Sequence, residues 1–344
     1  MNSNSPLVCV CIPVYNGAKT IGLTISSILA QNYPNFEIIV CDNLSTDSTI
    51  KLVEELKKTC NIKISILRNT NTGTAEDNWN FMLSNLKTEA EYLTIYHADD
   101  LYLSTILSEE VNFMQQNELM ASFTLCRLID EDGNDITEKN NYNPLIPKQI
   151  TSPIFRFEEL LKYILRFRNF FITPSFMFKR EVLNSIHPFF DNSNSKSSSD
   201  LDTWLRISKQ FKIGILQKTL MNYRISTSQG SFLIKQGRIQ PADFFQVVDS
   251  HLNELKDQTN YRREIRYYNI LKFVDLTICS VNILKSNETK DVETMLKRAM
   301  KLSNLIIVTR IKYIRIFLFA TCILGLLRLK RAKMSIEIAK RINL

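Results

Sequence analysis

Three carboxylates at the ends of apolar runs are the residues of this 344-residue sequence best placed to do chemistry. Asp42 ends one run, and Asp99 and Asp100 follow another, close to His97. Carboxylate oxygens suit Mg²⁺ or Mn²⁺, and a metal that is held by only one or two carboxylates can also bind a diphosphate. Because neighbouring acids are common, an alternative stays open: Asp42 only shapes a turn, and Asp99 and Asp100 only cap a helix.

The segments around these acids predict an α/β fold. Short runs rich in apolar and β-branched residues predict strands over 7–15, 36–41, 63–67 and 92–96. Amphipathic segments between them predict helices, so the pattern is that of βαβ units in a mostly parallel, Rossmann-like sheet flanked by helices. Ligands bind at the carboxyl ends of such strands, which is where Asp42, Asp99 and Asp100 fall.

Residues 131–230 continue this predicted domain with a looser pattern. They contain predicted helices over 157–167 and 201–211 and predicted strands over 171–178 and 213–223. The Ser-rich stretch 191–199 cannot bury apolar area, which predicts a mobile loop. The pattern after residue 243 is almost wholly helical. We therefore expect one domain over 1–230, divided near residue 130, and a helical C-terminal region over 231–344.

The positive charge of the chain is concentrated near its end. The net charge is +8, and residues 301–344 contain ten Lys or Arg and one Glu, so the rest of the chain is close to neutral. This distribution gives no support to nucleic-acid binding by the main domain. The seven cysteines show no CxxC pair, and the opening residues MNSNSP lack a signal-peptide pattern. Both features favour free thiols in a reducing, cytoplasmic compartment.

Five motifs occur in a fixed order along the chain: VCIPVYNG at 10–17, IIVCDNLSTDST at 38–49, NTGTAEDNWN at 71–80, HADD at 97–100 and DLDTWLR at 200–206. Together they resemble the family 2 inverting glycosyltransferases, which have a GT-A nucleotide-binding fold. The resemblance covers about residues 7–230. It implies a half over 1–130 that binds a nucleotide sugar and a half over 131–230 that binds the acceptor.

The resemblance also implies roles for residues of the first half. Pro13 and Tyr15 would flank the nucleobase, and Asp42 would bond to the edge of the base. Asp99 would hold Mg²⁺ or Mn²⁺ and so contact the nucleotide. Asp100 would support Asp99 or approach the donor sugar.

In the second half, Asp200 matches the aspartate that acts as base on the acceptor hydroxyl. Asp202 is a rival, since two residues lie more than half a helical turn apart and only one of them can face the cleft. Arg224 would either approach the diphosphate or form a structural salt bridge. Trp79 and Trp204 have helical apolar spacing, which is typical of core residues.

The sequence also departs from the family pattern. His97 stands where the first acid of the metal motif is usual, and Ser226 stands where a histidine often follows the Tyr-Arg pair. These departures keep a second possibility open, a catalytically degenerate nucleotide-sugar-binding or scaffold protein. A sugar-phosphate nucleotidyltransferase is disfavoured, because it would need a Gly-rich, basic loop where this chain has residues 13–17, PVYNG.

The resemblance implies transfer of a sugar, with inversion, from a nucleotide diphosphate sugar such as a UDP-sugar to a glycan or lipid-linked glycan. Such transfer builds cell-surface polysaccharides or glycolipids. Residues 316–327 are twelve uncharged residues between basic clusters, too few for the roughly 20 that a spanning helix needs. We therefore expect residues 303–341 to contact the cytoplasmic face of a membrane as a peripheral segment. An ordinary core helix with solvated basic ends is the alternative.

Overall fold

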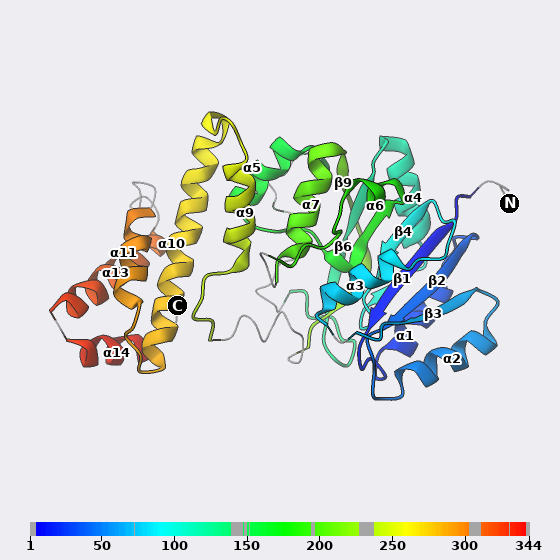
Figure 1. The fold of residues 1–344 in the computed structure, drawn as a ribbon, viewed down its shortest axis with the longest axis horizontal. Helices are drawn as coiled ribbons and strands as arrows, with labels where there is room; N and C mark the ends of the chain where they lie inside the picture. The colour runs from blue at the N-terminus through cyan, green and yellow to red at the C-terminus, as the bar shows by residue number, and fades with distance from the viewer. Residues whose placement is uncertain are drawn as a thin grey trace. The chain divides into compact units, whose positions relative to one another are not determined.

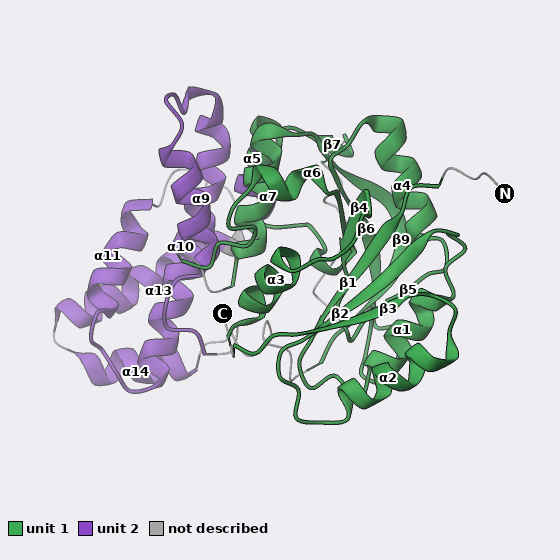
Figure 2. Ribbon diagram, turned by 45° about the vertical axis from the view of Figure 1, so that its right-hand side comes forward, with its two compact units in different colours: residues 1–161, 169–226 green, residues 162–168, 227–344 purple. Residues whose placement is uncertain are grey.

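The computed structural model describes residues 5–71, 73–138, 147, 150, 152–193, 197–226, 237–302, 311–329 and 331–341. They form two compact units, Met1–Leu161 with Asn169–Ser226, and Lys162–Arg168 with Thr227–Leu344 (Figure 2). Residues 194–196 of the predicted mobile loop lie outside the described residues. So do residues 303–310 and 330 of the basic tail.

The first unit is built on one sheet (Figure 1). Its strand order is β3-β2-β1-β4-β8-β6-β9-β5, with β7 paired to β9. β1, β2, β3 and β4 are parallel to one another, whereas β8 is antiparallel to both of its neighbours. The bounds of the strands are β1 Val8–Val14, β2 Phe36–Asp42, β3 Ile64–Arg68, β4 Tyr92–Ile95, β5 Leu101–Tyr102, β6 Ala121–Ile129, β7 Ile154–Phe155, β8 Phe176–Lys179 and β9 Ile213–Arg224.

Helices cover this sheet because side chains of each strand alternate between its two faces. Val8, Val10 and Ile12 of β1 belong to an apolar core that also contains residues of α1, α2 and α4. The helices of this unit are α1 Ile21–Leu29, α2 Thr49–Thr59, α3 Ala75–Ser84, α4 Ile106–Asn117, α5 Phe157–Phe167, α6 Glu181–Ser185 and α7 Ser199–Gln210. The predicted mostly parallel α/β sheet with flanking helices is confirmed.

Register places the predicted acids at one edge of the sheet. Val14 is paired with Asp42 at the carboxyl ends of β1 and β2. Ile95, the last residue of β4, is paired with Cys11 on the other side of β1. The chain then turns through residues 96–100 and enters β5, where Leu101 pairs with Asn222 of β9. The turn after β4 is therefore held between the parallel strands and β9.

The described part of the second unit is helical, as predicted for the C-terminal region. Its helices are α9 Asp243–Asn253, α10 Arg262–Lys285, α11 Val292–Leu302, α13 Ile311–Arg328 and α14 Ala332–Lys340. Residues of α10, α11, α13 and α14 share an apolar core of their own. Among the described residues, we find no helix that is both long enough and apolar enough to cross a membrane.

Candidate functional site

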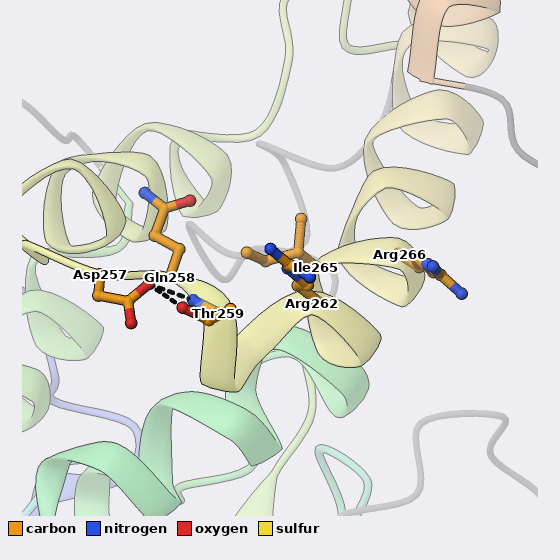
Figure 3. A pocket seen from close by; sticks show the side chains of 6 residues that line it. All are labelled: Asp257, Gln258, Thr259, Arg262, Ile265 and Arg266. Atoms are coloured by element: carbon orange, nitrogen blue, oxygen red, sulfur yellow. Dashed lines mark hydrogen bonds between the residues drawn. The ribbon is translucent and has the colours of Figure 1, made fainter.

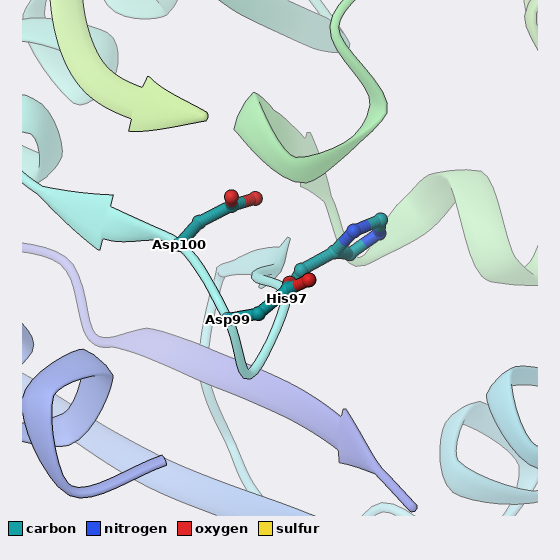
Figure 4. A group of neighbouring side chains, drawn as sticks. All are labelled: His97, Asp99 and Asp100. Carbon is teal, nitrogen blue, oxygen red and sulfur yellow. The ribbon is translucent and has the colours of Figure 1, made fainter. Parts of the chain in front are cut away.

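The turn after β4 brings three possible ligands together. A ring nitrogen of His97 and carboxylate oxygens of Asp99 and Asp100 all lie within 4.8 Å of one another. Figure 4 shows the three side chains projecting from this one turn. Asp100 is fully buried, whereas His97 and Asp99 are partly exposed. The prediction that these acids sit at the end of β4 is confirmed by the geometry, and the turn presents both nitrogen and oxygen donors.

Neighbouring elements hold this turn rigidly. The buried hydroxyl of Thr24, on α1, donates to the carbonyl oxygens of Ala98 and Asp100, at 2.9 and 2.8 Å. The backbone N–H of His97 donates to the hydroxyl of Tyr102 at 2.8 Å. These bonds fix the backbone on both sides of Asp99, and they therefore limit the positions that its carboxylate can take.

Arg224 fastens the same turn from β9. Its backbone N–H donates to Oδ1 of Asp100 at 2.8 Å, and its Nε donates to the carbonyl of Asp99 at 2.9 Å. Its Nη1 donates to the carbonyls of Asp130 and Glu131 at 2.9 and 2.8 Å. The side chain is 5% exposed. The structure therefore places this predicted diphosphate contact beneath the turn, where its guanidinium joins the ends of β4, β6 and β9.

Ser226, two residues after Arg224, also has a hydrogen-bond partner. Ser226, which stands where the family often has a histidine, donates from its hydroxyl to the Glu131 carboxylate at 2.8 Å.

Burial sets the electrostatics of the turn. It raises the pKa of Asp100 well above its usual range, and the nearby charge of Asp99 adds to this effect. Burial also lowers the pKa of His97, against the opposing effect of the Asp99 charge, which favours a neutral imidazole able to bind a metal.

Two atoms of the turn are left without a partner. Oδ2 of Asp100 and Nε2 of His97 are buried and have no hydrogen-bond partner in the described structure. Buried polar atoms are normally satisfied, and a metal ion at this turn would supply the partners that these two atoms lack. The donor set of carboxylate oxygens and an imidazole nitrogen fits a divalent metal ion.

The loops after β1 and β2 meet beside this edge. Asn16 Oδ1 accepts from the backbone N–H of Thr46 at 2.8 Å, and the Asn16 N–H donates to Ser45 at 2.9 Å. Tyr15 is 61% exposed, whereas Pro13 is buried within β1. Of these two predicted nucleobase contacts, the ring of Tyr15 is therefore exposed to solvent and Pro13 is not.

Asp42 is almost completely buried at the end of β2. Its Oδ1 accepts from the backbone N–H of Ser45 at 3.1 Å, which is the turn-shaping role that the sequence left open. The structure brings Asp42 to the predicted edge and assigns one of its two oxygens to the loop itself.

Asp200 lies in the first turn of α7. Its Oδ2 accepts from the hydroxyl of Thr173 at 2.8 Å, and its Oδ1 accepts from the backbone N–H of Leu201 at 2.6 Å. Burial raises the pKa of Asp200, and the charge of Glu76 on α3 adds to the rise, while the bond from Thr173 opposes it. A partly exposed carboxylate with a raised pKa is a suitable general base.

Asp202, the rival base, is engaged elsewhere. Its Oδ2 forms an ion pair with Nε of Arg206 at 2.6 Å, one helical turn along α7. Arg206 in turn donates to the carbonyls of Pro188 and Phe189 at 2.9 and 2.7 Å. Asp202 therefore anchors the chain that leads into α7.

Helix α3 contributes residues that the sequence analysis did not assign to the site. Trp79, predicted to be a core residue, is only partly buried, and its ring lies 5.6 Å from that of His97 and 4.9 Å from that of Phe190. The side chain of Asn80 accepts from the N–H of Phe190 at 2.9 Å and donates to its carbonyl at 2.7 Å. Trp204, also predicted to be core, is fully buried. The sequence signal for the contacts of Trp79 and Asn80 was the clustering of Asn and Trp in the motif at 71–80.

A pocket of about 400 Å³ lies in the second unit, at the start of α10 (Figure 3). It is lined by Asp257, Gln258, Thr259, Arg262, Ile265 and Arg266. None of these residues belongs to the predicted site.

Several relatives of this chain are named as glycosyltransferases. An uncharacterized glycosyltransferase of Rickettsia bellii is 27% identical over 233 residues, which are 66% of this chain and 30% of that protein. The O-antigen biosynthesis glycosyltransferase WbnJ of Escherichia coli is 28% identical over 64% of this chain and 80% of its own length. The UDP-Glc:alpha-D-GlcNAc-diphosphoundecaprenol beta-1,3-glucosyltransferase WfaP of Escherichia coli is 31% identical over 34% of this chain and 45% of its own length. The chain thus spans less than half the length of two of these three relatives.

Solved structures share the fold. Residues 1–349 of TarS from S. aureus, in complex with UDP, match with a TM-score of 0.58 and 17% identity over 97% of this chain and 90% of that one. The mannosyltransferase PcManGT from Pyrobaculum calidifontis, in complex with GDP-Man and Mn²⁺, matches with a TM-score of 0.55 and 16% identity over 98% and 86%. The fold of this chain is the GT-A fold of these proteins.

The sequence pattern of the family named Glycosyl transferase family 2 matches residues 9–186, more than half of the chain. This match spans β1 to β8 and includes the turn after β4. The chain belongs to glycosyl transferase family 2.

Proposed function

We propose that this chain is an inverting glycosyltransferase that moves a sugar from a uridine diphosphate sugar to an acceptor hydroxyl in cell-surface glycan synthesis. The observation that carries the proposal is Asp200, a partly exposed carboxylate with a raised pKa that is held by Thr173. Further support comes from TarS, whose solved complexes hold UDP and UDP-GlcNAc, and from the names of WbnJ and WfaP.

The proposed chemistry is an in-line displacement at the anomeric carbon of the donor. Asp200 takes the proton of the acceptor hydroxyl while the acceptor oxygen forms its bond to that carbon. The bond from the carbon to the diphosphate oxygen breaks on the opposite side, and the nucleoside diphosphate leaves. A single base suffices because a diphosphate needs no protonation to depart. Attack from the opposite side gives inversion.

Asp99, supported by Asp100, would hold the divalent metal, and Tyr15, Pro13 and Asp42 would bind the nucleobase. When bound, a divalent metal supplies positive charge that stabilises the developing charge of the departing diphosphate. Arg224 has a positioning role in this proposal, since its bonds fix the backbone of Asp99 and the carboxylate of Asp100.

The acceptor is proposed to be a lipid-linked glycan, in keeping with the name of WfaP. Support in this chain comes from α13, where Leu318 is 61% exposed. Arg315 and Arg328 are exposed on the same helix. The opposite side of α13 packs into the helical core through Ile316, Ala320 and Ile323. Only the outer side of this helix is therefore available to a membrane surface.

We expect Asp200→Asn to keep donor binding and to lose transfer by about a hundred- to ten-thousandfold, because an amide cannot take the proton. The matched control is Asp202→Asn, two residues after Asp200 in the chain. It removes a carboxylate that is paired with Arg206. Turnover would be measured as release of nucleoside diphosphate, per folded protein. Wild-type turnover in Asp200→Asn would remove the residue from the mechanism, and an equal loss in Asp202→Asn would leave the base unassigned.

Thr173→Val should move the acid limb of the pH profile of kcat/KM to higher pH. The Thr173 hydroxyl bond lowers the pKa of Asp200, so its removal raises that pKa further. A base is active only when deprotonated, and activity falls as the pH drops through its pKa. Thr173→Ser keeps the hydroxyl and should keep the wild-type limb. An unmoved limb in Thr173→Val would mean that a different group limits the rate.

Asp99→Ala should weaken the binding of UDP in the presence of Mn²⁺ by at least about ten- to a hundredfold, since loss of residues that only orient a metal's ligands already costs that much. Isothermal titration calorimetry would compare the variant with the wild type, each with Mn²⁺ and with EDTA. If the wild type binds UDP equally well in EDTA, the metal part of the proposal is wrong.

Co-sedimentation with anionic vesicles should test the membrane surface. We expect salt-sensitive binding, since each basic side chain near an anionic surface contributes about 1 kcal/mol. Binding should fall when the basic residues that flank 316–327 become Gln, namely Arg310, Lys312, Arg315, Arg328, Lys330, Arg331 and Lys333. Gln at the exposed Lys51, Lys57 and Lys58 of α2 is the control. Equal recovery in the supernatant with and without vesicles would exclude this surface.

A further inference from the structure

His97 adds a nitrogen donor to a pair of carboxylates. Its ring nitrogen lies within 4.8 Å of oxygens of both Asp99 and Asp100. A metal that binds nitrogen and oxygen at about 2.0 to 2.2 Å needs donors that are separated by no more than about twice that distance. Small side-chain rotations therefore suffice to bring all three groups onto one ion.

The surroundings of His97 leave a ring nitrogen for a metal ion and confine the imidazole. Its Nε2 is buried and has no partner in the described structure, and the fully buried Asp100 likewise leaves Oδ2 unpartnered. A buried polar atom without a partner is unfavourable, and a bound ligand would remove that cost. The ring of Trp79 lies 5.6 Å away, and the bond from the His97 N–H to Tyr102 fixes its backbone. The imidazole is thus confined beside the carboxylates.

We propose that His97 is a metal ligand together with Asp99, and that it makes this site prefer Co²⁺ over Mg²⁺. Mg²⁺ is a hard ion that favours an all-oxygen octahedral shell, whereas imidazole nitrogen suits transition metals. The inference rests on the proposed metal-assisted binding of a nucleoside diphosphate and specifies which ions that site takes.

Visible absorption of Co²⁺ gives a readout that does not depend on activity. Full-length protein with UDP would be titrated with Co²⁺, and the ratio of Co²⁺ to Mg²⁺ affinities would be measured by calorimetry. The variants are His97→Ala, which removes the nitrogen, and His97→Asp, which replaces it by a carboxylate. His187→Ala is the matched control, because His187 is exposed and lies outside the cluster.

The expected result is a change of the Co²⁺ spectrum in both His97 variants and a fall of the Co²⁺-to-Mg²⁺ affinity ratio by about tenfold or more, with no change in His187→Ala. His97→Asp should bind Mg²⁺ relatively better than the wild type does. Far-ultraviolet circular dichroism would confirm that each variant is folded.

Two results would overturn the inference. An unchanged Co²⁺ spectrum and affinity ratio in folded His97→Asp would exclude His97 as a ligand. A loss of UDP affinity in His97→Ala that is equal with each metal and with EDTA would show that the imidazole contacts the nucleotide instead. In either case, loss of metal-dependent UDP binding in Asp99→Ala would still support the proposed function, so the two claims can fail separately.

Discussion

The site depends on one buried interaction, that of Arg224 with the turn after β4. Its backbone N–H holds the Asp100 carboxylate, and its guanidinium donates to the carbonyls of Asp99, Asp130 and Glu131. A guanidinium is costly to bury unless its donors are satisfied, and an unsatisfied buried carbonyl costs about 1–3 kcal/mol. Loss of either Arg224 or the turn would therefore leave buried polar groups of the other without partners. Through this contact, β9 fixes the acids that follow a strand more than a hundred residues earlier in the chain.

A second set of contacts connects this turn with the proposed base. Trp79 of α3 lies against His97 and Phe190, and Asn80 of the same helix bonds to the backbone of Phe190 in both directions. Phe190 belongs to the chain that Arg206 and Asp202 fix before α7. Helix α3 thus links the acidic turn with the segment that leads to Asp200. Preorganisation of this kind is what lets a site position a nucleophile and a leaving group together.

The sequence predicted the parallel strands and the acids at their ends, because apolar runs and the βαβ order determine where strand ends meet. It did not predict β6, nor the two-residue strands β5 and β7, whose pairing with β9 depends on tertiary contacts. Thr173 was also missed, since its bond to Asp200 joins residues 27 apart without a sequence pattern. The ion pair of Asp202 with Arg206 follows from their helical i,i+4 spacing, a sequence signal that favours Asp200 as the free carboxylate of the two.

The anomeric configuration of the product is the sharpest test of Asp200 as the single base, because attack opposite the leaving group gives only inversion. Purified protein would be incubated with α-linked UDP-sugars and a panel of acceptor glycosides, with Mn²⁺ or Co²⁺ present. The anomeric coupling constant of the new glycoside would then be read by NMR. We expect release of UDP and a β-linked product. An α-linked product, or donor binding without any turnover across the panel, would contradict it.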